Sequence, residues 1–517
     1  MDFLTQHAQT DGARPAVLVD AAGGGRPSAT SYAELESLAN RLARALLATG
    51  AERFDRVAWC GPNSLEVLVT VHAARKAGLT AVPVSYRFTA EEMRYVIDNC
   101  DAVAVVVDAE QAPSVMSVRD RLPNVRAVIV YGGEVPDGCL DLEAVVAGES
   151  PDPLPETPGT EGSTTGATMI YTSGTTGKPK GAYRTRTHTE TVFAIMERLG
   201  LLEFTPMHLT TGPLYHSGPH GFAGFAHALG GCVVVLRKFD PVAWLRLVKE
   251  HRVTDTFTAP TQLKRIVALP PGELARADLT SMRTLVANAA PVPYALKQEI
   301  FAKLGDWFLY EVYGSTELGV TTVLDPHDQL RKPGSCGRTY GPVEVRIVGD
   351  DGAQCAANEP GELFIRTTLA MERYHRSEER LDEHDGEWKS VGDVAYLDDE
   401  GYLYICDRKK DMIISGGVNV YPAGIEAVLH EHPAVLDAAV FGVPDDEWGE
   451  RVHAILQPRD GMTIDLDDVR AFVDERLAGY KRPRGYQVRA ELPRTDSGKL
   501  LKRVLRDEFW SDRDSKV

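Results

Sequence analysis

The first third of the chain alternates segments of helical periodicity with short apolar runs, and this pattern restricts the fold more than any other feature. Leucines recur at helical spacing in residues 33–48, and Gly50 can end that helix. Further helices are expected at 64–77, capped by Asn63, and at 90–99. Strands are expected between them, at 56–60, 80–84, 102–107 and 128–130. Strands separated by helices need crossover connections, so the pattern predicts a mostly parallel sheet covered by helices.

The pattern changes twice further along the chain. Residues 183–330 alternate helix and strand again, whereas 333–406 contain short β runs between turn signals, at 343–348, 362–366 and 402–406. The charged run 407–410 marks an expected boundary, and beyond it the clearest helix is 466–478.

We therefore predict an α/β protein with two domains. The large N-terminal domain, residues 1–406, combines parallel-sheet α/β subdomains with a β-rich subdomain at about 333–406. A hinge at 407–410 leads to a small mobile α+β C-terminal domain, residues 411–517, which has an ordinary size for a domain.

Charge and cysteine usage exclude several classes of protein. The 517 residues include 74 Asp and Glu against 56 Lys and Arg, a net charge of −18, so no nucleic-acid partner is expected. Seven scattered cysteines without a CxxC pair favour reduced thiols. The longest uncharged stretch, 205–236, is broken by prolines and glycines. We expect no signal peptide, no integral membrane segment and a cytoplasmic protein.

One segment has the composition of a phosphate-binding loop. Residues 171–182 read Tyr-Thr-Ser-Gly-Thr-Thr-Gly-Lys-Pro-Lys-Gly-Ala. Glycines let backbone N–H groups approach an anion, hydroxyls donate further hydrogen bonds, and lysines supply charge. Only two residues separate Gly174 from Gly177, and Pro179 follows the first lysine, so the segment is not a Walker P-loop. The pattern indicates a polyphosphate site.

This segment also resembles the signature loop of the adenylate-forming enzymes, which include acyl-CoA synthetases, aryl-CoA ligases, luciferases and peptide-synthetase adenylation domains. Further blocks follow in the family's order, at 288–291, 313–317 (Tyr-Gly-Ser-Thr-Glu), 388–393, 407–411 and 493–499. The resemblance covers residues from about 30 to 505. The sequence as a whole resembles bacterial fatty-acyl-CoA synthetases more than plant-type coumarate ligases.

The resemblance implies a set of nucleotide-binding residues. The signature loop would wrap the β- and γ-phosphates of ATP, Tyr313 would lie against adenine, and Asp393 would accept hydrogen bonds from the ribose hydroxyls. The residues assigned to ATP or AMP are Thr172, Ser173, Gly174, Thr175, Thr176, Gly177, Lys178, Ala289, Ala290, Tyr313, Gly314, Thr316, Asp393, Arg408 and Lys499.

The resemblance also assigns catalytic roles. Thr316 would contact the α-phosphate, and Glu317 would hold Mg²⁺ together with phosphate oxygens. Lys499 would bridge the carboxylate and the α-phosphate, where a cation stabilises the charge that develops during attack on phosphorus. His216 matches the aromatic position that gates the acyl pocket in CoA ligases.

The thioester half of the reaction depends on other positions. Lys410 falls at the hinge about which the small domain would rotate, presenting Lys499 for adenylation and the loop Ser415, Gly416 and Gly417 for coenzyme A. The glycines would let the backbone lie beside the pantetheine arm.

The expected acyl pocket has small lining residues. They are expected to leave room for a long or bulky tail, and Phe222, Phe225 and Val320 would keep that room apolar. This favours medium- or long-chain fatty acids, or bulky aryl or steroid side-chain acids. The pocket residues are His216, Gly218, Gly221, Asn288, Ala289 and Val320.

We therefore expect an ATP-dependent carboxylic acid–CoA ligase of lipid metabolism that uses ATP, Mg²⁺ and coenzyme A and could form a homodimer. One alternative is an acyl-AMP ligase that loads a carrier protein, although 318–360 shows no obvious insertion of the kind such enzymes carry. The sequence also leaves open a luciferase-like enzyme that passes the acyl group to oxygen, and a non-catalytic nucleotide-binding sensor.

Overall fold

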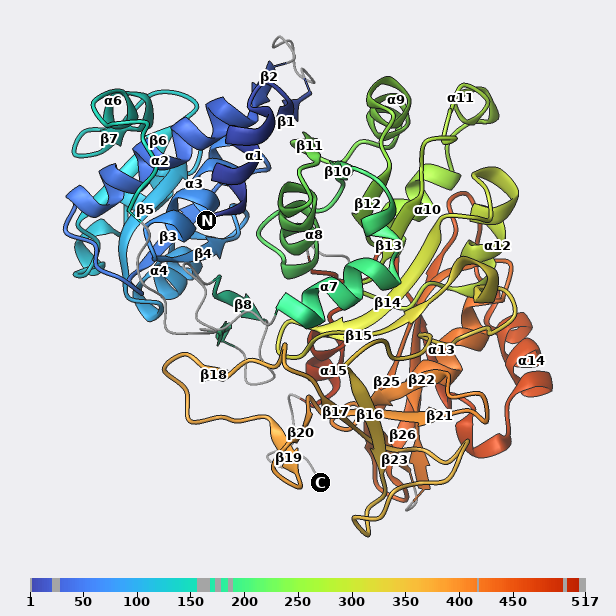
Figure 1. Cartoon of the computed structure of the whole chain (residues 1–517). Helices are drawn as coiled ribbons and strands as arrows, with labels where there is room; N and C mark the ends of the chain where they lie inside the picture. Colours follow the sequence, from blue (N-terminus) through green and yellow to red (C-terminus); the bar gives the residue numbers. More distant parts are fainter. Residues whose placement is uncertain are drawn as a thin grey trace.

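The computed structural model describes residues 2–20, 28–155, 168–172, 178–184, 189–415, 418–495 and 500–510 (Figure 1). Helix α1 (Phe3–Asp11) is the first element, and the described residues after it form five sheets. Within the described ranges no helix is long and apolar enough to cross a bilayer.

The first sheet is parallel throughout, in the order β4-β3-β5-β6-β7. Alternate residues of β3 face opposite layers: Val57 and Trp59 pack with α2 and α3, whereas Ala58 and Cys60 pack with α4 and α5. The strands are β3 (Arg56–Cys60), β4 (Thr80–Val84), β5 (Ala102–Asp108), β6 (Ala127–Tyr131) and β7 (Leu140–Asp141). The helices are α2 (Tyr32–Ala48), α3 (Leu65–Lys76), α4 (Ala90–Asn99), α5 (Ala112–Met116), η1 (Arg119–Arg121) and α6 (Leu142–Ala147).

The second sheet has eight strands in the order β15-β14-β13-β12-β10-β11-β1-β2, of which the inner pairs are parallel. Its strands are β1 (Pro15–Val19), β2 (Ser28–Ser31), β10 (Met207–Thr210), β11 (Cys232–Val235), β12 (Asp255–Thr258), β13 (Thr284–Ala287), β14 (Leu309–Ser315) and β15 (Gly319–Leu324). Its helices are α7 (Thr189–Arg198), η2 (Leu201–Glu203), α8 (Ser217–Ala228), α9 (Pro241–His251), α10 (Pro260–Val267), α11 (Pro271–Leu274), α12 (Tyr294–Lys303) and η3 (Pro326–Asp328).

A small antiparallel sheet carries the signature segment. Its strands β8 (Ile170–Thr172), β9 (Lys180–Tyr183) and β18 (Arg373–Tyr374) lie in the order β18-β9-β8. Strand β9 of this hairpin therefore pairs with a strand that comes much later in the chain.

The β-rich part forms a six-stranded antiparallel sheet in the order β19-β20-β17-β21-β22, with β16 paired to β17. The strands are β16 (Glu344–Val348), β17 (Gly361–Arg366), β19 (Asp382–His384), β20 (Trp388–Ser390), β21 (Asp393–Leu397) and β22 (Leu403–Arg408). Strand β22 runs into the predicted hinge, so the first two residues of 407–410 are part of a strand.

The last sheet belongs to the C-terminal region and has the order β24-β23-β26-β25, with β27 beside β26. Its strands are β23 (Ile413–Ser415), β24 (Val418–Val420), β25 (Val435–Asp445), β26 (Gly449–Pro458) and β27 (Gly485–Val488). Its helices are α13 (Pro422–His430), α14 (Leu466–Arg476), η4 (Gly479–Lys481) and α15 (Lys502–Trp510). The fold class is as predicted: parallel α/β sheets, a β-rich part and an α+β C-terminal unit.

One capping prediction was wrong. The N-cap of α3 is Ser64, whose side chain accepts a hydrogen bond from the Val67 N–H, and not Asn63. Asn63 is instead buried, donating to the Gly212 and Leu236 carbonyls. It joins loops that belong to the two large sheets, a long-range role that a local pattern does not reveal.

Candidate active site

The candidate site lies where α8 begins and β14 ends. His216 is the N-cap residue of α8, and Ser217 is its first residue. The Ser217 hydroxyl lies 3.0 Å from the hydroxyl of Thr316, which directly follows β14. The structure thus brings the predicted acyl-gating position next to the residue predicted to contact the α-phosphate.

Glu317 has a partner that the sequence analysis missed. The Tyr374 hydroxyl on β18 donates a 3.0 Å hydrogen bond to Glu317 Oε1. The Met371 N–H donates to the Glu317 carbonyl at 2.6 Å, so both ends of this residue are held by the segment around β18. Tyr374 could be found only from the pairing of β18 with β9, which local sequence does not show.

Arg184 is the second missed residue. It donates to the Thr316 carbonyl and, at 2.7 Å, to the Leu369 carbonyl. Burial lowers the pKa of Arg184 to about 10. Because Arg184 directly follows β9, it ties the signature hairpin to the block that carries Thr316 and Glu317.

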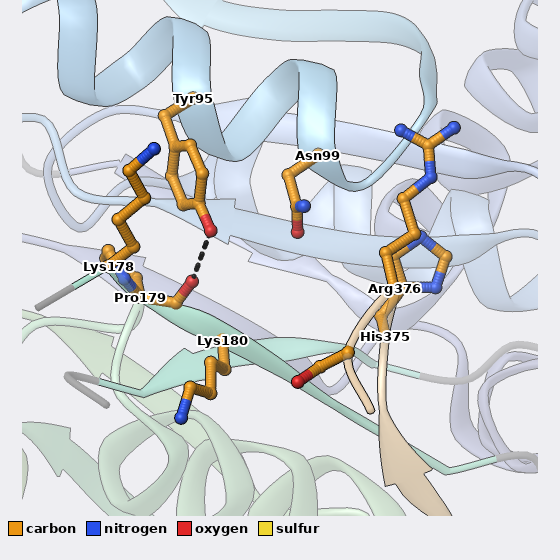
Figure 2. A pocket seen from close by; sticks show the side chains of 8 residues that line it. Tyr95, Asn99, Lys178, Pro179, Lys180, His375 and Arg376 are labelled. Carbon is orange, nitrogen blue, oxygen red and sulfur yellow. Dashed lines mark hydrogen bonds between the residues drawn. The ribbon is translucent and has the colours of Figure 1, made fainter. Parts of the chain in front are cut away.

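The structure describes the two strands of the signature hairpin, β8 and β9, together with Lys178 and Pro179. Thr172 pairs with Lys180, whereas Ser173, Gly174, Thr175, Thr176 and Gly177 lie outside the described residues. Figure 2 shows Lys178 and Lys180 leaving the chain on opposite sides. The Lys178 ammonium lies 5.4 Å from the Tyr95 ring centroid, and Lys180 pairs with Glu379.

A cavity of about 150 Å³ lies beside this hairpin, against the C-terminal part of α4. The Tyr95 hydroxyl on α4 donates to the Pro179 carbonyl at 3.0 Å (Figure 2). The cavity lining is rich in cationic side chains: Tyr95, Asn99, Lys178, Pro179, Lys180, His375, Arg376 and Ser377. This charge suits the neighbourhood of a polyphosphate.

Asp393 forms the centre of a polar cluster at the predicted ribose position. It lies opposite Arg408 in the β21–β22 register, and Arg408 Nε is 3.3 Å from Asp393 Oδ1. The Tyr313 hydroxyl donates to Asp393 Oδ2. Burial, and then the Asp393 charge, raise the pKa of the Tyr313 hydroxyl well above its usual value. Asp393 therefore contacts two other residues that are predicted to bind the nucleotide.

The turn after β13 has an unusual backbone. Ala289 adopts φ = 76°, in the left-handed region that non-glycine residues rarely occupy. The Asn288 side chain donates to the Val312 carbonyl at 2.7 Å and also accepts from the Ala289 N–H. Asn288 therefore holds this turn against β14, and Ala290 follows in the same turn.

The small residues Gly218 and Gly221 on α8 differ in how much space lies beside them. A Cβ built at Gly221 meets no described atom within 4 Å, whereas one built at Gly218 lies 2.3 Å from Cζ of Phe257. Gly218 is thus small because a phenylalanine ring packs against it. Val320 on β15 is partly buried against the same aromatic cluster, and it pairs with Gly314 across β14 and β15.

The predicted hinge and coenzyme A positions are spread over the junction with the last sheet. Burial lowers the pKa of Lys410, whose carbonyl accepts from Arg506 on α15 at 3.5 Å. Ser415 ends β23 and pairs with Gly449. Gly416, Gly417 and Lys499 lie outside the described residues.

The sequence matches the AMP-binding enzyme family over residues 4–375 and the AMP-binding enzyme C-terminal domain over residues 424–499. The chain therefore belongs to the AMP-binding enzymes, and the adenylate-forming resemblance is confirmed.

Individual relatives span nearly the whole chain. An indoleacetate–CoA ligase of Aromatoleum aromaticum is 36% identical over 480 residues, 92% of each chain. A feruloyl-CoA synthase of an Amycolatopsis species is 36% identical over 497 residues, 93% of this chain and 94% of that one. A fatty acid–[acyl-carrier-protein] ligase, ScoC, of Streptomyces coeruleorubidus is 33% identical over 524 residues, 99% and 96% of the two chains.

Solved structures share the complete architecture. The amide bond synthetase McbA from Marinactinospora thermotolerans superposes with a TM-score of 0.86 at 29% identity, covering 98% of this chain and 99% of that one. ATP-bound MatB from Rhodopseudomonas palustris gives a TM-score of 0.85 at 29% identity, covering 99% of both chains.

Proposed function

We propose that this chain is an AMP-forming carboxylic acid–CoA ligase that works through an acyl-adenylate. Family membership supports the adenylate, and two of the relatives above have CoA-ligase or CoA-synthase names. The observation that carries the proposal is the 3.0 Å contact between Ser217 and Thr316. It joins the start of the acyl-side helix to the block that follows β14, where a carboxylate and an α-phosphate would have to meet.

In the first step the carboxylate oxygen attacks the α-phosphorus, and pyrophosphate leaves. Thr316 would donate to the α-phosphate, and the signature loop with Lys178 would hold the leaving phosphates. Lys499 would approach the carboxylate and the α-phosphate, stabilising the charge that builds up between them. The Asp393 carboxylate accepts a hydrogen bond from Tyr313. It would also accept hydrogen bonds from the two ribose hydroxyls of ATP and so orient the ribose.

The residues present fit a magnesium ion. Glu317 supplies a carboxylate whose orientation is fixed by Tyr374, and magnesium is usually held by one or two carboxylates together with phosphate oxygens. When bound, the ion would neutralise charge on the phosphates. Glu317 is the residue that would hold it.

In the second step the CoA thiol attacks the acyl carbonyl carbon, the C–O bond to AMP breaks, and the thiol proton leaves to solvent or a nearby base. Lys410 is proposed as the hinge and Ser415, Gly416 and Gly417 as the loop beside pantetheine. Asp407 supports a hinge here, because its carboxylate accepts from the Ala423 N–H of α13 at 3.0 Å and so anchors the start of the second domain.

The acid is proposed to be apolar, because α8, which His216 caps, carries Phe222 and Phe225 in one apolar cluster with Val320. The named acids of the relatives, indoleacetate and ferulate, are of this kind, as are the fatty acids of ScoC. The names of ScoC and McbA point to two different acceptors, a carrier protein and an amine.

Product identification separates these acceptors. The enzyme is incubated with ATP, MgCl₂ and acids from acetate to C18, including benzoates, cinnamates and steroid side-chain acids, with and without CoA. Mass spectrometry showing acyl-CoA and AMP would support the ligase. Acyl-AMP that persists in the presence of CoA would contradict CoA as the acceptor, and the absence of pyrophosphate with every acid would favour a non-catalytic nucleotide sensor.

A cytoplasmic location is part of the proposal. It is supported by the seven cysteines, all of which lie in the described part of the chain and none of which forms a disulfide there. A homodimer stays a prediction.

A further inference from the structure

One aromatic ring fills the space beside the first turn of α8. A Cβ built at Gly218 would lie 2.3, 2.6 and 2.9 Å from three ring carbons of Phe257, closer than real Cβ contacts come. Phe257 belongs to β12, and only 8% of its surface is exposed. The ring therefore packs directly on the Gly218 backbone, two residues after His216.

Two more rings continue this wall along the helix. Phe222 lies 5.1 Å from Phe257 and 5.3 Å from Phe225, measured between ring centroids. These spacings are those of packed aromatic pairs. The three rings share a core cluster with Val286, on the strand beside β12. The space between α8 and the sheet is thus occupied by side chains.

The position three residues further along the same face of α8 is open. At Gly221 an added Cβ meets no described atom within 4 Å, in contrast to the crowded position at Gly218. An acyl group placed beside His216 would therefore find room over Gly221 and meet an aromatic wall at Gly218.

We infer that Phe257 determines the acid specificity of this enzyme, by closing the acyl pocket toward the sheet so that it accepts compact ring-bearing acids and rejects long alkyl chains. The inference rests on the proposed function and narrows its substrate class. A flat ring can pack against the aromatic wall, whereas a long chain would have to displace Phe257 from beneath Gly218.

The first test compares two Phe→Leu variants in an acid panel. Phe257→Leu removes the wall, and Phe308→Leu is the matched control, because Phe308 is fully buried in a different core cluster. Pyrophosphate release is measured with phenylacetate, cinnamate, decanoate and palmitate. We expect wild type to favour the ring acids at least 100-fold in kcat/KM over palmitate. Phe257→Leu should raise the decanoate-to-phenylacetate ratio at least tenfold, and Phe308→Leu should leave it unchanged.

A second test adds the missing Cβ. Gly218→Ala should raise the KM for ring acids at least tenfold with little change in the KM for ATP, because the new methyl group displaces the Phe257 ring into the pocket. The double variant Gly218→Ala with Phe257→Leu should recover most of this loss. A Gly218→Ala enzyme with the wild-type acid profile would overturn the inference.

Binding of inert adenylate mimics keeps the two proposals distinguishable. Phenylacetyl- and palmitoyl-sulfamoyladenosine are titrated into wild type and Phe257→Leu by calorimetry, without CoA or turnover. Tight binding of the ring mimic and recovery of palmitoyl binding in the variant would support the inference even if CoA were not the acceptor. A preference of wild type for the palmitoyl mimic, or unchanged ratios in the variant, would overturn it while the ligase proposal stands.

Discussion

The Tyr374 hydroxyl is one atom on which the phosphate chemistry is expected to depend. Its 3.0 Å hydrogen bond fixes Glu317 Oε1, and a hydrogen bond to a charged group contributes roughly 1.5–3 kcal/mol. Tyr374→Phe should therefore leave Glu317 less well oriented. We predict that the Mg²⁺ concentration for half-maximal pyrophosphate release rises about tenfold, the lower end of that range. A magnesium titration at saturating ATP measures the shift.

Tyr171 provides the matched control. Tyr171 lies on β8 of the same small sheet, and its hydroxyl donates to Asn99 Oδ1 of α4 at 2.7 Å and not to Glu317. Tyr171→Phe should leave the magnesium requirement unchanged. Equal shifts in both variants would show that Tyr374 acts through the stability of the sheet rather than through the carboxylate.

At the scale of elements, a buried ion pair joins α12 to β14. Lys297 Nζ lies 2.5 Å from Glu311 Oε2, and both side chains are almost completely buried. Glu311 also accepts from the Val292 N–H. Lys297→Met leaves a buried carboxylate without its cation, which costs about 3–5 kcal/mol. We predict a loss of this size in the free energy of unfolding, measured by urea denaturation.

An exposed pair on the same helix is the control. Lys303 and Glu299 interact at 2.9 Å with side chains 40% and 45% exposed, and surface pairs contribute about 0–1 kcal/mol. Lys303→Met should therefore change the unfolding free energy little. If adding Glu311→Gln to Lys297→Met restored no stability, the unpaired charge would not be the cause of the loss.

A histidine pair connects α3 to α8 and gives the fold a pH dependence. His227 Nε2 lies 3.0 Å from the Ala16 carbonyl and must carry a proton, so its Nδ1 accepts from His72 Nε2 at 2.9 Å. Burial lowers the pKa of His227 to about 4 and that of His72 well below 6.5. Both rings are therefore neutral in the folded protein at neutral pH.

The sign of the effect follows from linkage. A histidine in the unfolded chain has a pKa of about 6.5, so below this pH the unfolded chain binds a proton that buried His227 does not bind. The stability that is present above pH 6.5 is therefore lost as the pH falls toward 4. For His227 the loss is on the order of 3 kcal/mol. Thermal unfolding midpoints between pH 7.5 and 5 should decline less in His227→Gln than in wild type. The control His327→Gln changes an exposed ring and should decline as wild type does.

The elements themselves follow from local sequence, but their contacts do not. Apolar periodicity and turn residues predicted β3, β4 and α4 at their observed bounds, because a buried strand or helix must show its period in the sequence. The true cap of α3, the Tyr374 contact and the ring beneath Gly218 all depend on packing or pairing that a local pattern does not reveal. The nucleotide-binding residues were predicted from the family resemblance. The packing of Phe257 against Gly218, on which the proposed acid specificity rests, could be found only in the folded structure.

At the scale of the molecule, the C-terminal sheet contacts α10, the helix that follows β12 in the second sheet. Lys264 on α10 donates to the Leu436 carbonyl at the start of β25 at 3.2 Å. Arg494 and Leu500, which lie on either side of residues 496–499 in the sequence, form an antiparallel bridge, and Arg494 pairs with Asp437 of β25. The Lys264–Leu436 contact supports the proposal that the C-terminal unit delivers Lys499 to the N-terminal part.

The central claim, a ligase that works through an acyl-adenylate, is tested most directly by isotope transfer. Phenylacetate labelled with ¹⁸O in both carboxyl oxygens is converted with ATP, MgCl₂ and CoA. The ¹⁸O content of each product is then measured by mass spectrometry. Attack of the carboxylate on the α-phosphorus, followed by cleavage of the acyl C–O bond, must leave one ¹⁸O in AMP and one in the acyl-CoA. Unlabelled AMP, or ADP and phosphate in place of AMP and pyrophosphate, would contradict the account.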